Sequence, residues 1–308
     1  MAEPLMFKTT MEFEYGLPRE LAPGVRRLVA NNPGPFTYKG TNTYLIGSKS
    51  LAVIDPGPLD PLHCASILRA AGKRPITHII LTHTHPDHID GLPALLAATG
   101  AKTAGYGGYQ LTSRVVPPAR AAGEGAQTNR AWRPDIQLRD GSELAGEDWA
   151  VTALHTPGHT PDHLSFALKP TSPDVRVLFP GDHVMAWNTS VVAPPSGRMG
   201  DYLASLEKLM GRDDTVAFPG HGGQYETPAR VAKAYLIHRR MRDAAILECI
   251  KGGATKIDQI VAQIYKGLDP RLVQAASMSV LAHIEHQFER DLITASGPLS
   301  LASVLAAV

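Results

Sequence analysis

The segment Thr82-His83-Thr84-His85-Pro86-Asp87-His88 constrains this chain most, because it places four potential metal ligands within six residues. Neutral imidazoles and a carboxylate that crowd together are costly to remove from water unless each finds a partner. Zinc is such a partner, since imidazole nitrogen and carboxylate oxygen are among its usual ligands. In an extended turn His83 and His85 point the same way, whereas Asp87 and His88 lie further along. The spacing therefore predicts two clusters, one for each of two metal ions.

Three more candidate ligands each follow a short apolar run that is typical of a strand. They are His159 in HTPGHTPDH, Asp182 in FPGDH and His221 in FPGHG. Glycine and proline beside each ligand allow the backbone to turn sharply and bring the side chain inward. An isolated histidine is most often an ordinary surface residue, but seven candidate ligands in this order indicate a metal site.

Apolar runs alternate with helical stretches up to about residue 230, which predicts an α/β layered fold with its polar cluster at strand ends. Residues 43–54 are typical of a hairpin, and residues 62–71, 93–99 and 202–210 of helices. Residues 105–140 are rich in Gly, Pro, Ala and Arg and predict a long excursion. This excursion is either a substrate-binding loop, in part helical, or a solvated linker.

The ligand pattern stops after residue 230, where helices are predicted at 231–250, 256–265 and 271–290. We therefore expect a catalytic domain over residues 1–230 and a small helical domain over residues 231–308. Such a tail can form a homodimer interface as readily as it can read a nucleic acid.

Composition excludes several classes of protein. The net charge is +1, so no concentrated basic field favours a DNA-coating protein. The two cysteines, Cys64 and Cys249, lie far apart in the sequence and do not indicate a disulfide framework. No apolar run approaches the ~20 residues of a membrane helix, and the N-terminus does not resemble a signal peptide. We therefore expect a cytoplasmic protein without membrane contact.

The ordered motifs HTHPDH, HTPGHT, PGDH and PGHG resemble those of the metallo-β-lactamase superfamily over about residues 40–225. The resemblance implies an αββα sandwich that holds two zinc ions at one edge. It assigns the first ion to His83, His85 and His159, the second ion to Asp87, His88 and His221, and a bridging role to Asp182. Iron or manganese can occupy the same nitrogen and oxygen ligands.

The match is closer to the branch of this superfamily that contains beta-lactamase-like protein 2. That branch shares the TPGHTxDH form of residues 156–163, the pair Asp201-Tyr202 and a winged-helix-like tail. The loop after Asp182, HVMAWNTSVVAPPSGR, departs from the branch pattern, so the resemblance leaves the substrate open.

The expected nucleophile is a hydroxide that bridges the two metal ions. Two zinc ions bring four positive charges, of which Asp87, Asp182 and the hydroxide remove three, so the site stays suited to a developing oxyanion. We expect Asp87 to orient the hydroxide and to take its proton. Asp55 and His163 are expected to hold the ligands in orientation, although ordinary turn hydrogen bonds explain them equally well.

We expect the bond attacked to be that of an ester, thioester, lactone or amide. The candidate substrate contacts are Trp187, Asn188, Thr189 and Tyr202, for which plain loop packing is the alternative. The branch resemblance implies a second hypothesis, a zinc-dependent endoribonuclease that cleaves single-stranded RNA. Its phosphate contacts would be arginines of residues 105–140 and the tail residues Arg239, Arg240, Arg242, Lys251 and Lys256.

A small-molecule substrate is favoured over RNA, because from Glu226 onward the tail carries ten Lys and Arg against eight Asp and Glu. A β-lactamase is disfavoured, since secreted lactamases need an export signal and one group uses cysteine where this chain has Asp182. A non-enzymatic zinc protein is disfavoured because structural zinc sites are closed and usually rich in cysteine.

Overall fold

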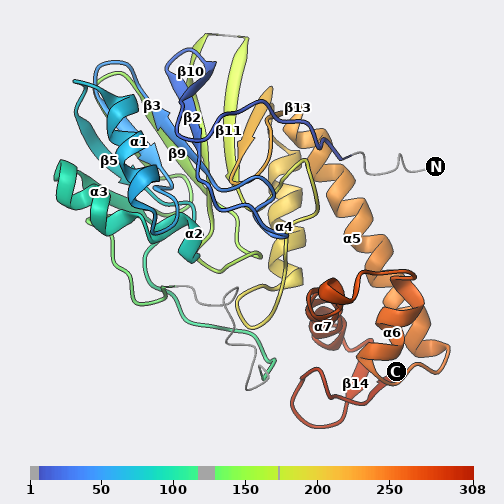
Figure 1. The fold of residues 1–308 in the computed structure, drawn as a ribbon. Helices are drawn as coiled ribbons and strands as arrows, with labels where there is room; N and C mark the ends of the chain where they lie inside the picture. The colour runs from blue at the N-terminus through green and yellow to red at the C-terminus, as the bar shows by residue number, and fades with distance from the viewer. Residues whose placement is uncertain (1–6, 117–128, 173) are drawn as a thin grey trace.

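The structure, a computed structural model, describes residues 7–116, 129–172 and 174–308 (Figure 1). Its main part consists of two sheets that face each other. The first sheet has the strand order β1-β2-β3-β4-β5-β6-β7. These strands are β1 (Arg19–Ala22), β2 (Val25–Val29), β3 (Asn42–Ile46), β4 (Leu51–Ile54), β5 (Ile76–Ile80), β6 (Lys102–Gly105) and β7 (Ile136–Gln137).

The second sheet has the order β13-β12-β11-β10-β9-β8. Its strands are β8 (Glu143–Ala145), β9 (Ala150–His155), β10 (Leu164–Ser172), β11 (Val175–Gly181), β12 (Val216–Pro219) and β13 (Tyr225–Glu226). Strands β4 to β7 run parallel to one another, as do β11 and β12, whereas the remaining pairs of both sheets are antiparallel. The carboxyl ends of β5, β11 and β12 each lead into a loop that carries predicted ligands.

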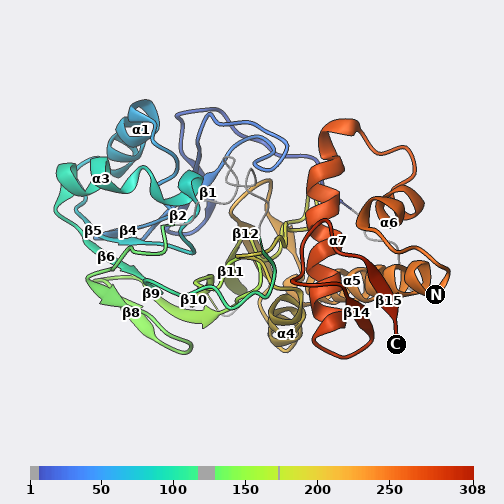
Figure 2. The same cartoon turned by 90° about the horizontal axis from the view of Figure 1, so that it is seen from below.

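Helices cover both outer faces of the two sheets. Figure 2 shows α1 (Pro61–Ala71) and α3 (Leu92–Thr99) over the first sheet. On the second sheet lie α4 (Met199–Met210) and α5 (Pro228–Lys251), whose Leu206 and Tyr235 pack with Leu178 of β11. The four-residue helix α2 (Pro86–Ile89) stands at the edge. The predicted αββα sandwich is confirmed.

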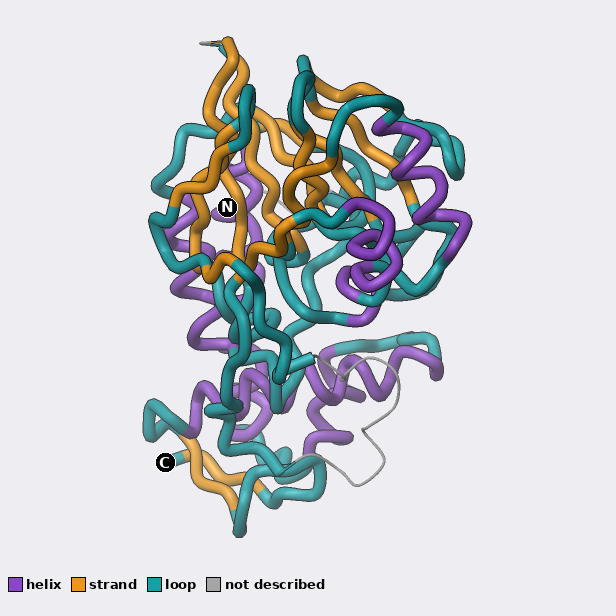
Figure 3. The backbone as a smooth tube through the Cα atoms, turned by 90° about the vertical axis from the view of Figure 1, so that its left-hand side faces the viewer, coloured by secondary structure: helices purple, strands orange, loops and turns teal. Residues whose placement is uncertain are grey.

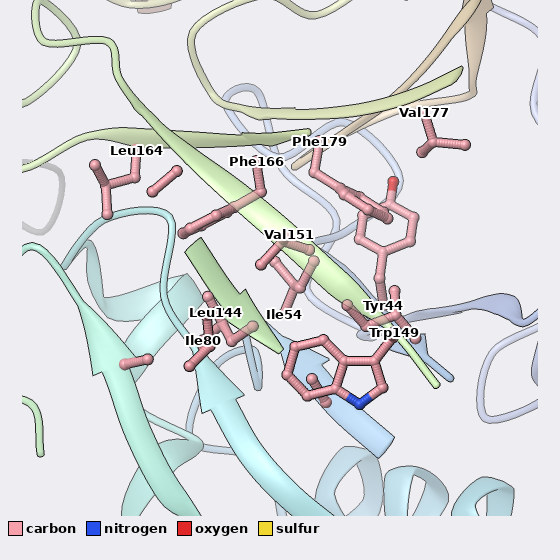
Figure 4. Close-up of a cluster of buried hydrophobic side chains, with 14 of the residues drawn as sticks. Tyr44, Ile54, Ile80, Leu144, Trp149, Val151, Leu164, Phe166, Val177 and Phe179 are labelled. Carbon is pink, nitrogen blue, oxygen red and sulfur yellow. The ribbon is translucent and has the colours of Figure 1, made fainter. Parts of the chain in front are cut away.

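The main core lies between the two sheets (Figure 4). Tyr44 and Ile54 of the first sheet meet Val151, Phe166 and Phe179 of the second, and all five are buried. Strands β3 and β4 are buried on both faces, because alternate side chains point to the helices on the other side. This double burial explains why these strands read as nearly continuous apolar runs in the sequence.

The C-terminal part contains α6 (Ile257–Ile264), the 3-10 helix η1 (Pro270–Leu272), α7 (Val273–Phe288) and the hairpin of β14 (Ile293–Ala295) and β15 (Leu305–Ala307). Figure 3 shows this hairpin at the opposite end of the molecule from the sandwich strands. The three predicted helices are present. The hairpin was not predicted, because strands of three residues show no periodicity that a sequence reading can detect.

Helix α5 crosses the predicted domain boundary at residues 230 and 231. Its first half, with Tyr235 and Leu236, belongs to the cluster that covers the second sheet. Its second half, with Ile246 and Ile250, belongs to the core formed with α6 and α7. The division into residues 1–230 and 231–308 therefore stays a prediction.

The excursion over residues 105–140 contains β7 but no helix in its described parts, 105–116 and 129–140. Residues 117–128, which include Arg120, lie outside the described residues. On one side the Val116 amide donates to Leu299 O (2.8 Å) of the C-terminal part. On the other, the Asn129 amide donates to Thr84 O (3.1 Å), between two predicted ligands. The excursion thus touches both the C-terminal part and the ligand loop.

Among the residues that the structure describes, no helix combines the length and the apolar character required to cross a membrane.

The core between the sheets makes a first prediction. Phe166 is fully buried there, so Phe166→Ala should lower the free energy of unfolding by about 3–5 kcal/mol. Phe36→Ala is the matched control, because Phe36 is 49% exposed and its loss should change stability by only about 0.5 kcal/mol. Urea unfolding of both variants measures the difference, and equal midpoints would contradict the assigned core.

Candidate metal centre

The seven predicted ligands lie together in loops that follow β5, β9, β11 and β12. The segment after β5 extends through His85, the residue before α2, and α2 then carries Asp87 and His88. His159 follows β9, Asp182 follows β11 directly, and His221 follows β12. These loops meet at one edge of the sandwich, beside α2 in Figure 1.

Three imidazoles form the first group, His83, His85 and His159. His83 Nε2 and His159 Nε2 each lie 2.9 Å from His85 Nδ1. Burial, together with the neighbouring His159, lowers the pKa of His85 to about 3. Burial also holds the pKa of His83 well below its usual range. Neutral imidazoles with converging nitrogens are the form in which histidine binds a metal ion.

The second group consists of Asp87, His88 and His221. Asp87 Oδ2 lies 3.3 Å from both His88 Nε2 and His221 Nε2. Burial alone would lower the pKa of His221, but Asp182 and Asp87 raise it to about 9. The Thr41 hydroxyl donates to Asp87 Oδ2 (2.8 Å) and fixes the orientation of this carboxylate.

Asp182 lies between the two groups. Its Oδ2 is 3.2 Å from His221 Nε2 and 3.8 Å from His159 Nε2, and its Oδ1 is 3.6 Å from His88 Nε2. Although burial favours the protonated acid, His221 and His88 hold the pKa of this carboxyl well below its usual range. One carboxylate therefore faces both groups.

The cluster fits a bound metal better than it fits a self-contained hydrogen-bond network. His88 Nε2 and Asp182 Oδ1 are buried and have no hydrogen-bond partner. An unsatisfied polar atom costs about 1–3 kcal/mol, more where it is charged, so such atoms call for a further partner. Cations would satisfy both atoms together with the converging nitrogens of the first group. The His and Asp groups thus form a metal site of nitrogen and oxygen ligands.

Asp55 holds the first ligand loop in place. It adopts a positive φ of 54° directly after β4. Its Oδ1 accepts from the Thr82 amide (2.8 Å), and its Oδ2 accepts from the Thr82 hydroxyl (2.7 Å) and lies 2.8 Å from His88 Nδ1. This contact leaves His88 Nε2 free to face the cluster, as expected of a carboxylate that orients a ligand.

His163 supports Asp182 through the backbone. The Asp182 amide donates to His163 Nε2 (3.1 Å), and His163 Nδ1 lies 2.9 Å from the Thr156 hydroxyl. Burial holds the pKa of His163 well below its usual range, which suits an acceptor nitrogen. These contacts agree with the roles expected of Asp55 and His163. That the two residues orient metal ligands stays a prediction.

The residues proposed to contact substrate differ in exposure. Asn188 is exposed, and Thr189 and Trp187 are partly exposed. The ring of Trp187 stacks on Tyr38 with centroids 4.9 Å apart, so Tyr38 joins this surface. Tyr202 is fully buried and its hydroxyl donates to His183 O (2.8 Å), so we assign it no contact with substrate. Because Tyr202 is buried, the expectation that it contacts substrate is wrong.

Sequence reasoning missed Thr41, Val191 and Gly40 because they act through contacts between distant segments. His159 Nδ1 lies 2.6 Å from Val191 O, and His221 Nδ1 lies 3.3 Å from Gly40 O. Every residue type has the same backbone carbonyl, so no sequence signal could have identified Val191 or Gly40. Thr41 is equally unmarked, since a threonine before a strand is common.

Gly220 allows the close approach of Asp182, and this generates a second prediction. A methyl group at position 220 would lie 2.2 Å from Asp182 Oδ1 and 2.9 Å from His88 Cε1. Gly220→Ala should therefore displace the carboxylate and lower metal affinity about 10–100-fold, with the fold retained. Metal content after dialysis against a chelator, together with far-UV circular dichroism, measures both effects.

The control for this prediction is Gly211→Ala, whose methyl group would lie 3.6 Å from Lys208 O, an ordinary van der Waals contact. Metal affinity in this variant should equal that of the unchanged protein. Unchanged metal affinity in Gly220→Ala would contradict the position assigned to Asp182.

Comparisons with known proteins agree with this geometry. Residues 37–221 match the family model of the metallo-beta-lactamase superfamily, and residues 257–297 match the beta-lactamase associated winged helix domain. The C-terminal part therefore contains a winged helix domain of this kind; the match includes β14, and β15, which pairs with β14, follows its last residue.

Several curated proteins are similar over most of the chain. The Beta-lactamase-like protein 2 homolog of Drosophila melanogaster is 31% identical and the alignment covers 86% of this chain and 87% of that protein. The homolog of the same name from Caenorhabditis elegans is 28% identical, over 75% of this chain and 72% of that protein. The Atrochrysone carboxyl ACP thioesterase of Claviceps purpurea is 26% identical, over 80% of this chain and 73% of that protein.

Solved structures show the same fold. A metallo-beta-lactamase family protein from Thermus thermophilus superposes with a TM-score of 0.73 at 21% identity, covering 94% of this chain and all (100%) of that one. A beta-lactamase domain protein from Burkholderia ambifaria superposes with a TM-score of 0.75 at 18% identity, covering 97% and 95%. Because the family model spans more than half of the sequence and the His and Asp cluster lies within the matched residues, this chain belongs to the metallo-beta-lactamase superfamily and is a metal-dependent hydrolase.

Proposed function

We propose that this protein is a binuclear zinc hydrolase of carboxyl derivatives, with a thioester as the first substrate class and esters, lactones and amides as the related ones. The observation that carries the proposal is Asp182, a single carboxylate that faces both ligand groups. The similarity to an ACP thioesterase supports the thioester as the first class to test.

In this proposal His83, His85 and His159 hold one ion and Asp87, His88 and His221 hold the other, with Asp182 shared. When bound, the ions would lower the pKa of a water molecule and would stabilise the negative charge of the oxyanion. Zinc fits this nitrogen and oxygen set, which iron or manganese can also occupy.

Asp87 is the proposed catalytic residue. Its side chain is 27% exposed, compared with 9% for Asp182 and 2% for Asp55. It is therefore the carboxylate of the cluster that solvent and substrate reach most readily. The Thr41 hydroxyl donates to Oδ2, which leaves Oδ1 as the oxygen that can accept a proton from the attacking water.

The proposed substrate surface is the aromatic pair Tyr38 and Trp187, with Asn188 and Thr189 beside it. Trp187 packs against Gly222, the residue after the ligand His221. Stacked rings next to a metal cluster offer apolar contact to an acyl chain, while the Asn188 amide adds a polar contact.

Cleavage of single-stranded RNA is the alternative, and several contacts weigh against it. Arg239 is only 4% exposed, and Arg240 and Lys251 pair with Glu207 and Glu248. Helix α7 is buried over most of its length, so it does not present a free face to a nucleic acid. These contacts remove much of the basic surface that RNA would need.

The discriminating experiment is a substrate panel at fixed zinc concentration. It contains acyl thioesters, lactones, a β-lactam and a fluorescent single-stranded RNA. The proposal expects turnover of a thioester or lactone that chelation abolishes and zinc restores. Turnover of the RNA alone, lost in His85→Ala, would instead support the ribonuclease.

Asp182→Asn provides the third prediction. The amide keeps the size of the side chain but loses the charge shared by both ligand groups. One of two bound ions should therefore be lost, and turnover should fall by more than the about 10–100-fold that loss of a residue supporting a ligand causes. Metal analysis of the purified variant and the thioester assay measure these effects. Asp213→Asn is the control, because the Asp213 side chain is 83% exposed and lies outside the cluster. Two ions and full turnover in Asp182→Asn would refute the shared ligand.

The cytoplasmic location and a homodimer through residues 231–308 stay proposals. Size-exclusion chromatography of the full chain measures its oligomeric state.

A further inference from the structure

The loop formed by residues 183–191, which follows Asp182, is held by side chains from outside it. Three tyrosine hydroxyls donate to its carbonyl oxygens: Tyr202 to His183 O (2.8 Å), Tyr225 to Val184 O (3.1 Å) and Tyr235 to Asn188 O (2.5 Å). A fourth donor is Arg239 Nη2, which bonds Ser190 O. Buried carbonyls without regular secondary structure require such partners, so these four donors determine the path of the loop.

This loop contacts the metal centre at both of its ends. At one end it begins directly after Asp182, and the Ser190 hydroxyl donates to His183 O (2.8 Å). At the other end Val191 O lies 2.6 Å from His159 Nδ1. A carbonyl that binds one ring nitrogen sets both the tautomer and the orientation of the imidazole, so Val191 O directs His159 Nε2 toward the cluster.

Arg239 holds the end of the loop that contacts His159. It is 4% exposed and lies on α5, one turn after Tyr235. Its Nη1 lies 3.4 Å from the Ser279 hydroxyl of α7, and its guanidinium carbon is 5.5 Å from the centre of the Tyr202 ring. The Arg239 side chain therefore connects α4, α5 and α7 to the peptide that precedes Val191.

We propose that Arg239 is a positioning residue for the metal centre, which acts on His159 through Ser190 O and Val191 O. The inference rests on the proposed role of His159 as a ligand. It gives α5 and α7 a function in the metal site: they carry the donors that set the geometry of the loop after Asp182. Deletion of residues 231–308 would remove both Tyr235 and Arg239 from this loop.

An arginine suits this task better than a lysine. The guanidinium is planar and donates in several fixed directions, so one side chain reaches Ser190 O, Ser279 Oγ and the face of Tyr202 together. An ammonium group is a compact donor on a flexible chain and does not reproduce this arrangement. Arg239→Lys therefore keeps the positive charge but does not reproduce the three contacts of the guanidinium.

The test measures Co²⁺ affinity of the metal-free protein by absorption spectroscopy, in four forms: unchanged, Arg239→Lys, His159→Ala and the double variant. Arg239→Lys should weaken Co²⁺ binding about tenfold when His159 is present, and should have no further effect when His159 is absent. An equal loss in both backgrounds, or no loss in either, would overturn the proposal.

Two further variants separate positioning from general stability. Arg240→Lys, on the neighbouring residue with a side chain 62% exposed, should bind Co²⁺ as the unchanged protein does. Ile246→Val removes a methyl group from a fully buried position of the same helix, so it should lower the melting temperature without changing Co²⁺ affinity.

Tyr235→Phe carries the test if Arg239→Lys does not fold, because it removes only the phenol hydroxyl, which donates to Asn188 O. Tyr235→Phe should weaken Co²⁺ binding less than Arg239→Lys does, and it should have no effect in the His159→Ala background. The same loss of affinity in both backgrounds would overturn the proposal. Turnover enters none of these measurements. A failure of thioester hydrolysis would therefore leave the role of Arg239 standing.

Discussion

The carboxylate of Asp55 is the contact on which the metal centre depends most. It joins the end of β4 to the end of β5 by accepting from the Thr82 amide and hydroxyl, and it meets His88 on α2. These contacts fix the segment that carries four of the seven candidate ligands. Asp55 is only 2% exposed, so its oxygens find their partners within the protein, and the backbone adopts a positive φ to place them.

On the opposite side of the centre, the loop formed by residues 183–191 is held by side-chain hydrogen bonds from the helices. His159 contacts this loop, which has no regular secondary structure and whose carbonyls are bound by tyrosines and an arginine of the helical layer. Asp55, at the carboxyl end of β4, supports the segment after β5, whereas side-chain donors of the helices support the loop that contacts His159. This division explains why helices α4, α5 and α7 contact one another behind the loop.

Aromatic side chains lie beside the centre, and for this reason we propose an apolar substrate group rather than a polyanion. Tyr38 and Trp187 stack beside the candidate ligand His221. In the C-terminal part Arg239 is buried, and Arg240 and Lys251 pair with Glu207 and Glu248. In the winged helix domain, α7 packs against α4 and the core of that domain. This packing makes α7 part of the core of the molecule, whereas a role of the domain in dimerisation or in nucleic-acid binding stays a proposal.

The sequence by itself determined the superfamily fold, the main helices and the seven candidate ligands. This was achievable because metal ligands follow strands in fixed motifs and because doubly buried strands read as apolar runs. Short strands such as β7, β14 and β15 were out of reach, since two or three residues carry no detectable period.

Only the tertiary structure decided what orients the ligands and what lines the site. Val191 O and Gly40 O act through backbone atoms, which are the same in every residue type. Tyr202 looked like a substrate contact, and Arg239 like a phosphate contact, until burial placed both behind the centre. The physical reason is common to all four: residue type states what a group can bind, whereas its partner is set by segments that meet only when the chain has folded.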